Sequence, residues 1–320
     1  MGDGLDPQLL SRARGALLGL VAGNQLAAPT QHLGTPEAIR QAFPDGVWDL
    51  SPSPPGSPYD DDAALALMLA ESLVERRGFD ADDVARRWVR WMERDGRGLG
   101  TLTRRALTLI DQHVEPFEAG RRALLDEPQG AAGSGSVTRC IPVALRYHDD
   151  VDRLIRVSHQ QAAITHADER SSWGAVAANL AARELLHGNI YFVEEVVHQL
   201  QDKAPRALLE ALHRVPRERQ EDLPVRAGQP AGYVVHCVEI AFWFATHDRS
   251  VEDALVYLAQ AGGDSGGNAT LTGALLGARY GDAGIPPQWI GKIAGLKGVT
   301  RLADGLVQQS IERGARTTLS

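Results

Sequence analysis

Three consecutive aspartates, Asp60 to Asp62, stand directly before a segment whose leucines and alanines recur with helical spacing. Aspartates at a helix start can cap the helix and offset its dipole, for about 0.3–1 kcal/mol each. One or two would suffice for that purpose. Three adjacent carboxylates repel one another, and a bound cation would relieve the repulsion. The group therefore indicates a cation site, with helix capping as the structural alternative.

A further carboxylate, Asp264, stands in a polar, glycine-rich stretch that begins at Ala261. Glycines let backbone N–H groups approach a ligand, and a helix N-terminus favours anions. The stretch is expected to be a loop, followed by a closely packed helix over Ala269 to Ala278 with glycines four residues apart. Alone it is more typical of a glycine-rich turn before a tightly packed helix. Together with Asp60 to Asp62 it predicts two loops that meet around one site.

A third polar stretch, Gly133-Ser-Gly-Ser-Val-Thr-Arg-Cys-Ile-Pro142, is predicted to be non-helical. Its serines and backbone amides could bind an anion, with which Arg139 could form an ion pair. An exposed flexible loop explains these residues equally well. His166 stands alone in Ile164-Thr-His-Ala-Asp168, and a lone histidine is usually a hydrogen-bonded residue at a helix end.

The elements that would position these residues are helices. Apolar residues recur with helical spacing along the chain, and no pattern typical of β-strands or βαβ units is present. The first helix, Pro7 to Ala28, carries Gly15, Gly19 and Gly23. This stripe permits close helix contact, at a cost of about 1 kcal/mol per glycine relative to alanine.

Residues 34–58 are expected to form a loop, because the prolines at its end cannot belong to a helix. Further helices are expected over 61–77, 82–95, 100–110, 151–161, 171–187, 191–219 as a pair, 232–244 and 251–261, with two more after Trp289. The helix over 171–187 is apolar on most sides and is expected to be central. The sequence thus predicts a single all-α domain over residues 1–320.

Composition is ordinary for a globular protein. The 320 residues are 43% hydrophobic and 23% charged, which is enough for a substantial core. A net charge of −8 argues against nucleic acid or an anionic membrane as the partner. Two cysteines, Cys140 and Cys237, suggest neither a disulfide framework nor a zinc site, and they fit a reducing cytoplasm. The apolar run near the N-terminus is too short for a signal peptide or a membrane span.

Six motifs, in chain order, resemble those of the ADP-ribosylglycohydrolase family. They are Gly15-Ala-Leu-Leu-Gly-Leu-Val-Ala-Gly23, Tyr59-Asp-Asp-Asp62 with the helix after it, Gly133-Ser-Gly-Ser-Val-Thr-Arg139, Thr165-His166, Gly232-Tyr-Val-Val235 and Gly262-Gly-Asp-Ser-Gly-Gly-Asn-Ala269. The resemblance spans nearly the whole chain. It implies an all-α fold with two magnesium ions at the bottom of a cleft, in which the bond between C1″ of ADP-ribose and a protein side chain is hydrolysed.

The resemblance also implies roles for individual residues. Asp60, Asp61 and Asp264 match metal-ligating aspartates, and Asp60 and Asp61 are also implied to serve catalysis. The residues implied to contact the substrate are Gln31, Ser134, Gly135, Ser136, Arg139, His166, Tyr233, Ser265, Gly266, Gly267 and Asn268. The expected partner is an ADP-ribose-type or nucleoside-type small molecule, free or attached to a modified protein. The expected cofactor is Mg²⁺.

Several positions depart from the family's pattern. The family's pattern has aspartate, glutamate, threonine, asparagine, aspartate and a hydroxyl residue at six positions where this chain has, in order, Asn24, Gln31, Tyr59, Ser134, Gly266 and Gly267. Glycine offers no side-chain ligand, and glutamine cannot transfer a proton near neutral pH as glutamate does. Asp62 adds a carboxylate, but a helix turns about 100° per residue, so Asp62 is not expected to replace a lost ligand. One bound ion, or none, is therefore as compatible with the sequence as two.

Three functions remain open at this point. The first is a divergent hydrolase of an ADP-ribosyl or related ribosyl N- or O-glycosidic bond, supported by the retained aspartates. The second is a non-catalytic module that binds ADP-ribose or a nucleotide, or a structural protein, supported by Gln31, Gly266 and Gly267. The third is an enzyme of altered chemistry on a nucleoside-like substrate, because a fold does not fix a function.

Overall fold

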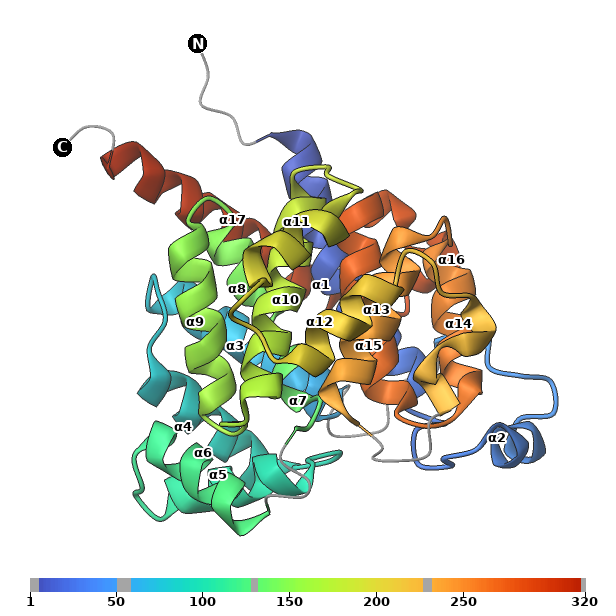
Figure 1. Ribbon diagram of the computed structural model, residues 1–320, viewed down its shortest axis with the longest axis horizontal. Coiled ribbons are helices and arrows are strands. Elements are labelled where there is room, and N and C mark those ends of the chain that lie inside the picture. Colours follow the sequence, from blue (N-terminus) through green and yellow to red (C-terminus); the bar gives the residue numbers. More distant parts are fainter. Residues whose placement is uncertain (1–5, 51–58, 128–131, 227–231, 318–320) are drawn as a thin grey trace.

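Helices form the regular structure of the computed structural model, which describes residues 6–50, 59–127, 132–226 and 232–317 (Figure 1). Within those ranges there is no β-strand, and an isolated antiparallel bridge joins Gly133 to Tyr233. The α-helices are α1 (Pro7–Ala27), α2 (Pro36–Ala42), α3 (Asp61–Glu75), α4 (Ala81–Arg94), α5 (Thr101–Asp111), α6 (Pro116–Asp126), α7 (Gly135–Thr138), α8 (Ile141–Tyr147), α9 (Val151–Ala163), α10 (Glu169–Leu186), α11 (Phe192–Leu200), α12 (Arg206–Arg214), α13 (Val234–Thr246), α14 (Val251–Ala261), α15 (Ser265–Tyr280), α16 (Pro287–Ile290) and α17 (Leu296–Thr317). The predicted all-α fold is confirmed.

Helices α1 and α15 pack with their backbones in direct contact, as the glycine spacing predicts. The contact pairs, in antiparallel order, are Gly15 with Gly277, Gly19 with Gly273, and Gly23 with Ala269. A β-carbon at any of the three α1 glycines would overlap the main chain of α15, so only glycine fits there. Because the two helices are antiparallel, the C-terminal end of α1 lies beside the N-terminal end of α15.

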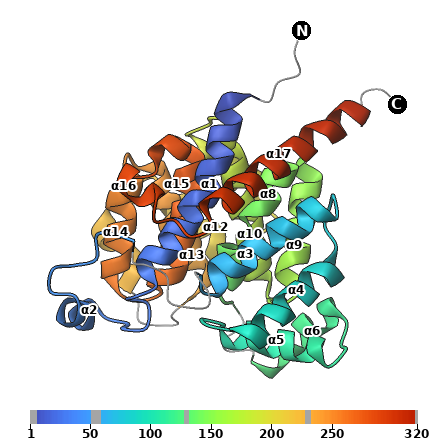
Figure 2. The same ribbon diagram turned by 180° about the vertical axis from the view of Figure 1, so that it is seen from behind.

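The remaining helices surround this pair. Figure 2 shows α1, α3 and α17 together on one face of the molecule, with α10 and α13 behind them. Helix α10 is buried along most of its length, as expected for a central helix. One cluster of buried apolar side chains extends from Leu9 in α1 to Val307 in α17, so helices from both ends of the chain share a core. The single-domain division of residues 1–320 stays a prediction.

Three local expectations are wrong. Helix α2 lies within the stretch expected to be a loop, where Thr35 caps it by accepting from Ala38 N at 3.2 Å; residues 51–58 lie outside the described residues. Helices α7 and α8 occupy most of the stretch 133–142, because Pro142 stands in the first turn of α8, where its missing N–H costs nothing. Helix α15 begins at Ser265 instead of Ala269, because Asp264 caps it.

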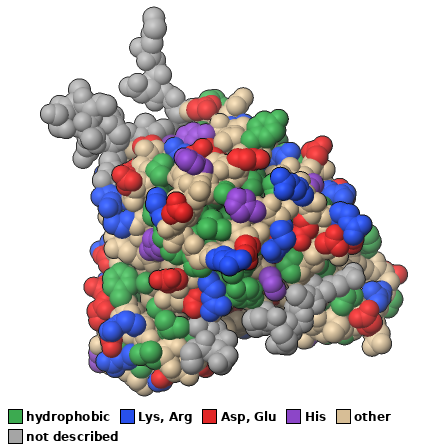
Figure 3. All heavy atoms as spheres, viewed as in Figure 1, with side chains coloured by type: hydrophobic (Ala, Val, Ile, Leu, Met, Phe, Trp, Pro, Cys, Tyr) green, Lys and Arg blue, Asp and Glu red, His purple; other side chains and the backbone are tan. Residues whose placement is uncertain are grey.

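The surface mixes charges and apolar side chains. On the face seen in Figure 3, acidic, basic and hydrophobic side chains are interspersed. Among the described residues, no helix is both long and apolar enough to cross a membrane.

Candidate functional site

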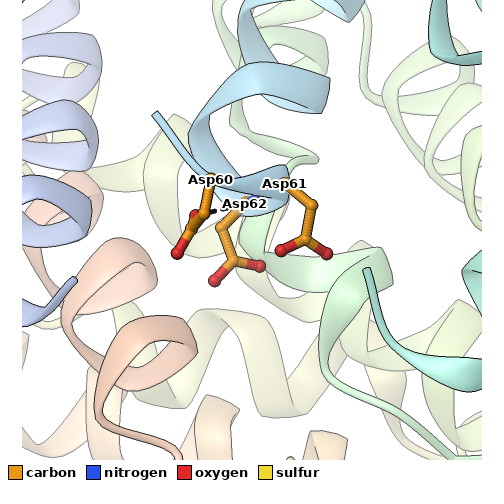
Figure 4. Close-up of side chains that lie close together, drawn as sticks. All are labelled: Asp60, Asp61 and Asp62. Atoms are coloured by element: carbon orange, nitrogen blue, oxygen red, sulfur yellow. Dashed lines mark hydrogen bonds between the residues drawn. The ribbon is translucent and has the colours of Figure 1, made fainter. Parts of the chain in front are cut away.

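The acidic cluster, defined as Asp60, Asp61 and Asp62, lies at the N-terminus of α3 (Figure 4). Asp60 is the N-cap: its backbone is extended, with φ −88° and ψ −166°, and its carboxylate accepts a hydrogen bond from the N–H of Asp62 at 3.2 Å. Each of the three aspartates offers one oxygen, and these atoms all lie within 4.8 Å of one another. Carboxylates that converge in this way could hold a metal ion.

The expectation that helical rotation would keep Asp62 apart from the other two carboxylates is wrong. Side chains of a helix lean toward its N-terminus, so in the first turn the carboxylates of Asp61 and Asp62 both extend toward the helix end, where Asp60 lies. Rotation about the helix axis separates the Cα–Cβ bonds, but the remaining length of each side chain lets the carboxylates approach one another. The group at this helix end is therefore Asp60, Asp61 and Asp62 together.

The acidic cluster favours protons or other cations. Burial raises the pKa of all three carboxyls, and the charges of neighbouring aspartates raise the pKa values of Asp61 and Asp62 further. Asp60 and Asp61 are only 6% and 9% exposed. The Oδ2 atom of Asp60 is buried and has no hydrogen-bond partner among the described residues. An orphaned carboxylate oxygen beside two further carboxylates fits a bound cation.

Asn24, near the end of α1, holds Asp60 in place. It is fully buried, and its Nδ2 donates a short hydrogen bond to Asp60 Oδ1. The N–H of Asp60 donates in return to Asn24 Oδ1 at 3.4 Å. An aspartate at position 24 would face Asp60 with another negative charge, whereas asparagine supplies a neutral donor. This departure from the family's pattern thus lowers the negative charge of the site.

Gln31 connects the acidic cluster to the first turn of α15. It follows α1, where its backbone N–H donates to Ala27 O at 3.0 Å. Its side chain lies close enough to Asp60 to oppose the rise that burial causes in the pKa of that carboxyl. Its Oε1 occupies the space that a β-carbon at Gly266 would need. Gln31 and Gly266 are therefore complementary, because the amide fills the volume beside a residue that has no side chain.

Tyr59 is directed away from the acidic cluster. Its Oη donates to Ala294 O at 2.5 Å, and a β-carbon at Gly295 would collide with the same hydroxyl. The residue at position 59, where the family's pattern has a threonine, thus has its hydroxyl at the start of α17. Burial raises the pKa of Tyr59 to about 12, so the phenol stays protonated.

Asp264 approaches the acidic cluster from the other side. As the N-cap of α15 it accepts from Gly267 N at 3.4 Å, and Ser134 Oγ donates to its Oδ2 at 2.9 Å. Its negative charge contributes to the raised pKa values of Asp60, Asp61 and Asp62, which places it electrostatically within the same site. A β-carbon at Gly267 would lie 2.7 Å from Asp264 Oδ2, so the missing side chain makes room for this carboxylate.

The stretch with Ser134, Gly135 and Ser136 is held against the start of α13. Ser134 N donates to Gly232 O at 2.7 Å, beside the bridge between Gly133 and Tyr233. Ser136 is buried and donates its Oγ to Ser171 O at 3.1 Å, so its hydroxyl is already used. Most described residues from 132 to 142 are buried, and the alternative of an exposed loop is wrong for them.

Arg139 is buried beneath this stretch. It is 1% exposed, its guanidinium lies 4.3 Å from the centroid of the Trp88 ring, and its Nη2 donates to Thr165 Oγ1 at 2.6 Å. Its charge lowers the pKa of Asp61, although burial has the larger, opposite effect. In this structure Arg139 therefore positions Thr165 and supplies a buried positive charge near the acidic cluster.

His166 and Tyr233 both lie beside Gly133. His166 is 4% exposed, and its Nδ1 lies 2.7 Å from Thr165 Oγ1. Burial lowers its pKa to about 3, so the imidazole is neutral near pH 7. A β-carbon at Gly133 would lie 2.9 Å from His166 Nε2, which explains why glycine precedes Ser134. Tyr233 is half-buried, with the Arg170 guanidinium 5.7 Å from its ring centroid.

The first turn of α15 brings the other predicted contact residues together. Ser265, Gly266, Gly267 and Asn268 all lie in it, and all four are buried. The Ser265 hydroxyl has no hydrogen-bond partner among the described residues. Asn268 is 5% exposed, and its N–H donates to Asp264 O at 3.0 Å.

Gly98 also contacts the acidic cluster, although sequence reasoning did not single it out. It has φ +79°, and a β-carbon there would collide with Asp61 Oδ1. The preceding carbonyl, of Arg97, accepts from Asp61 N at 3.1 Å. Three glycines, Gly96, Gly98 and Gly100, stand between α4 and α5, and the contact of Gly98 arises only because the turn after α4 lies against the N-terminus of α3.

The oxygen atoms that this site offers to a metal fit one cation better than two. The acidic cluster provides three carboxylates and an unpartnered oxygen. On the side of α15, positions 266 and 267 carry no side chain, and Gln31 and Asp264 fill the space above them. A second ion with ligands from both positions has no side-chain oxygens there.

Comparisons with known proteins agree with the motifs. The family model described as ADP-ribosylglycohydrolase matches residues 5–316. The ADP-ribosylarginine hydrolase Tri1 of Pseudomonas putida strain GB-1 is 27% identical over 312 residues, which cover 95% of this chain and 80% of the relative. The ADP-ribosylhydrolase ARH3 of Bos taurus is 27% identical over 350 residues, covering 93% and 92%.

A solved structure described as an ADP-ribosylglycohydrolase-related protein complex is also similar. The likeness has a TM-score of 0.76 with 28% sequence identity, and it covers 95% of this chain and 99% of the other. The family model spans nearly all of the chain, and the motifs occur in it in the same order on an all-α fold. The protein therefore belongs to the ADP-ribosylglycohydrolase family.

Proposed function

We propose that this protein is a divergent hydrolase that cleaves an ADP-ribosyl, or a related ribosyl, N- or O-glycosidic bond with the help of one magnesium ion. The observation that carries the proposal is the acidic cluster, with an orphaned Asp60 oxygen and carboxyls of raised pKa. A purely structural cap would not require three converging carboxylates. The family supports the reaction class, and its named relatives act on ADP-ribosylated substrates.

The ion would be held by Asp60, Asp61 and Asp62, with Asp264 as a further carboxylate facing it. Hard oxygen ligands of this kind suit Mg²⁺. When bound, the ion would supply a positive charge that orients the ribose hydroxyls and stabilises developing negative charge. One ion, instead of the family's two, follows from the two glycines and from the position of Gln31.

The chain's own groups would do the remaining work. Asp60, fixed by Asn24 and Gln31, and Asp61, fixed through its N–H, would accept or return the proton of the attacking water. The neutral His166 and the half-buried Tyr233, both beside Gly133, would contact the substrate. Ser134, Gly135, Ser265 and Asn268 would offer backbone and side-chain polar groups to its phosphates or riboses.

The second candidate is a module that binds ADP-ribose or a nucleotide without cleaving it. The observation in its favour is that Gln31, which stands where the family has a glutamate, is engaged with Asp60 and fills the space beside Gly266. A glutamine that is held in this way cannot serve as an acid or a base.

Cleavage and binding assays separate the two candidates. ADP-ribosylated arginine and serine peptides are incubated with wild type, with Asp61→Ala and with Asp82→Ala, each with Mg²⁺ or with a chelator. Asp82 is a matched control, since it is an exposed aspartate in the first turn of another helix, α4. The hydrolase proposal expects Mg²⁺-dependent release of ADP-ribose by wild type and Asp82→Ala, and a loss of about 100-fold or more in Asp61→Ala.

Calorimetry with ADP-ribose supplies the other readout. Binding of ADP-ribose without cleavage of either peptide by wild type would leave the binding module as the function. In that case the double variant Gln31→Glu/Gly266→Asp tests whether hydrolytic activity can be restored.

We also propose a cytoplasmic location, on the support of two buried free cysteines, Cys140 and Cys237. The partner would be an ADP-ribose-type or nucleoside-type small molecule, free or attached to a protein side chain.

A further inference from the structure

A second recess lies on the side of α3 where Tyr59 points, between α3, α4 and α17. We call it the α3–α17 groove and define it by Tyr59, Leu67, Met68, Trp91, Val299 and Leu302. Its volume is about 250 Å³. An adjoining recess of about 540 Å³ extends along α4 and shares Met68 and Trp91 with it. Figure 2 shows α3 and α17 side by side at this face. Recesses of this size and apolar lining commonly hold small molecules.

Two arginines lie at the place where the groove meets the adjoining recess, which we call the mouth: Arg94 lines both recesses, and Arg90 lines the adjoining one. Arg90 and Arg94 are four residues apart on α4, so they lie on one face of that helix, and both are exposed. Within the part of the chain that the structure describes, no ion pair involves either of them. Arg87, one turn earlier, differs, because it pairs with Asp83 at 2.7 Å and with Glu71 at 3.3 Å.

The charge balance at the mouth is positive. Two glutamates, Glu71 and Glu93, also line the adjoining recess. Arg87 lines this recess as well, and its guanidinium is shared by Glu71, Glu75 and Asp83. The lining of the adjoining recess thus holds three arginines against two glutamates, and Arg90 and Arg94 are the arginines that have no carboxylate partner among the described residues. An arginine without a carboxylate partner retains its fork of N–H donors for a planar or tetrahedral anion.

The floor beside α17 is open. A β-carbon at Gly298 would meet no atom within 4 Å, although Gly298 lines the groove. At the other end, the ring of Tyr59 forms a wall, with its hydroxyl donating to Ala294 O. An apolar body can therefore lie between α3 and α17 without displacing a packed side chain.

We propose that the α3–α17 groove is a second binding site, which takes an amphipathic anion. The apolar part of the ligand, of the size of two or three aromatic rings, lies against Leu67, Trp91 and Leu302. Its phosphate, carboxylate or sulfonate group binds Arg90 and Arg94. Burial of the rings and charge-assisted hydrogen bonds to the guanidinium groups favour the complex together. The site requires neither the acidic cluster nor any hydrolase activity.

The test uses 8-anilinonaphthalene-1-sulfonate, an aromatic sulfonate whose fluorescence rises in apolar surroundings. The dye is titrated into the full chain, and the Kd is measured for wild type and variants. We expect saturable binding at one site, weakened about tenfold or more in Arg90→Ala/Arg94→Ala, since each lost charge-assisted hydrogen bond removes that order of affinity. Gly298→Leu, which fills open space, should abolish it.

Matched controls keep the outcome decisive. Arg86→Ala removes another exposed arginine of α4, and Gly291→Leu adds a side chain at another glycine whose β-carbon would meet no atom within 4 Å. Both should bind the dye as wild type does, and so should Asp61→Ala. Circular dichroism confirms that each variant is folded.

Three results would overturn the proposal. The first is unchanged dye binding in both Arg90→Ala/Arg94→Ala and Gly298→Leu. The second is displacement of the dye by ADP-ribose or its loss in Asp61→Ala, which would place the dye at the acidic cluster. The third is a change of oligomeric mass in Gly298→Leu, measured by light scattering, with unchanged dye affinity, which would make the groove an interface between copies.

Discussion

Two helices of this protein each begin with three aspartates and use them differently. Asp60 caps α3, with Asp61 and Asp62 in its first turn, and Asp80 caps α4, with Asp82 and Asp83 in its first turn. At α4 the buried carboxylate, Asp83, accepts hydrogen bonds from two arginines. At α3 the polar neighbours of Asp60 are the side chains of Asn24 and Gln31, which are neutral.

The proton affinities follow from those neighbours. Burial acts on both groups, but hydrogen bonds from Arg76 and Arg87, each 2.7 Å long, hold the pKa of Asp83 well below its usual value. In the acidic cluster, burial and mutual repulsion raise the pKa values instead. The helix dipole favours negative charge at both N-termini and does not distinguish them. Asp83 forms its ion pairs with arginines of the protein and is therefore structural. The acidic cluster has no such ion pairs among the described residues and can bind a cation from solution.

Magnesium should separate the two groups most strongly. At a concentration a hundred times the Kd, a ligand that binds only the native state adds about 2.7 kcal/mol to the free energy of unfolding. We expect calorimetric unfolding to show this gain in wild type and in Asp82→Asn, because Asp82 belongs to the arginine-neutralised group. Asp62→Asn should lose most of it. Equal stabilisation of Asp62→Asn and wild type would remove the acidic cluster as the magnesium site.

Removing the structural carboxylate should have the next largest effect. Asp83→Asn should lower the free energy of unfolding by about 2 kcal/mol in urea denaturation, because it leaves Arg87 with fewer buried partners. The value is below that of a fully buried pair, since Arg76 is half exposed. Asp82→Asn is the control and should change stability by less than about 0.5 kcal/mol. A similarly small change in Asp83→Asn would contradict the assigned role.

The corresponding substitution in the acidic cluster should act in the opposite direction. Without divalent cations, Asp62→Asn should raise the free energy of unfolding by about 0.5–1 kcal/mol, because it removes repulsion between buried carboxylates. The measurement is urea denaturation in the presence of a chelator. Destabilisation by Asp62→Asn under these conditions would mean that the carboxylate has a structural partner, as Asp83 has.

A smaller effect is expected in acid, where the contribution of Asp83 to the free energy of unfolding should decline. Because its folded-state pKa lies below the ordinary 3.8, the native protein binds fewer protons there than the unfolded chain does. The stability that Asp83 confers is therefore complete above about pH 5 and declines as the pH falls through 3.8 toward the lower folded value. The difference in unfolding temperature between wild type and Asp83→Asn should shrink from pH 5 to pH 3. A constant difference would contradict this origin of the stability.

The sequence alone predicts much of the fold and part of the site. Helical periodicity predicts an all-α protein, and the glycine stripes predict that two helices pack closely against their neighbours, because only a residue without a side chain permits such an approach; that α1 and α15 are each other's partner is seen only in the structure. Tripled aspartates before an apolar helix indicate a cation site. Local capping explains two of the misses, since Thr35 starts a helix within an expected loop and Asp264 starts α15 one turn before the apolar pattern does.

Only the tertiary structure decided what the departures from the family's pattern mean. Gln31 and Gly266 are far apart in the chain, and each alone reads as a lost functional group. Antiparallel packing of α1 on α15 brings them together. The side-chain amide of Gln31 then fills the space beside Gly266 and lies close to Asp60. Likewise, Arg87 follows Asp83 by four residues on α4 and can be expected from the sequence, whereas only the packing of α3 against α4 brings Arg76 to the same carboxylate.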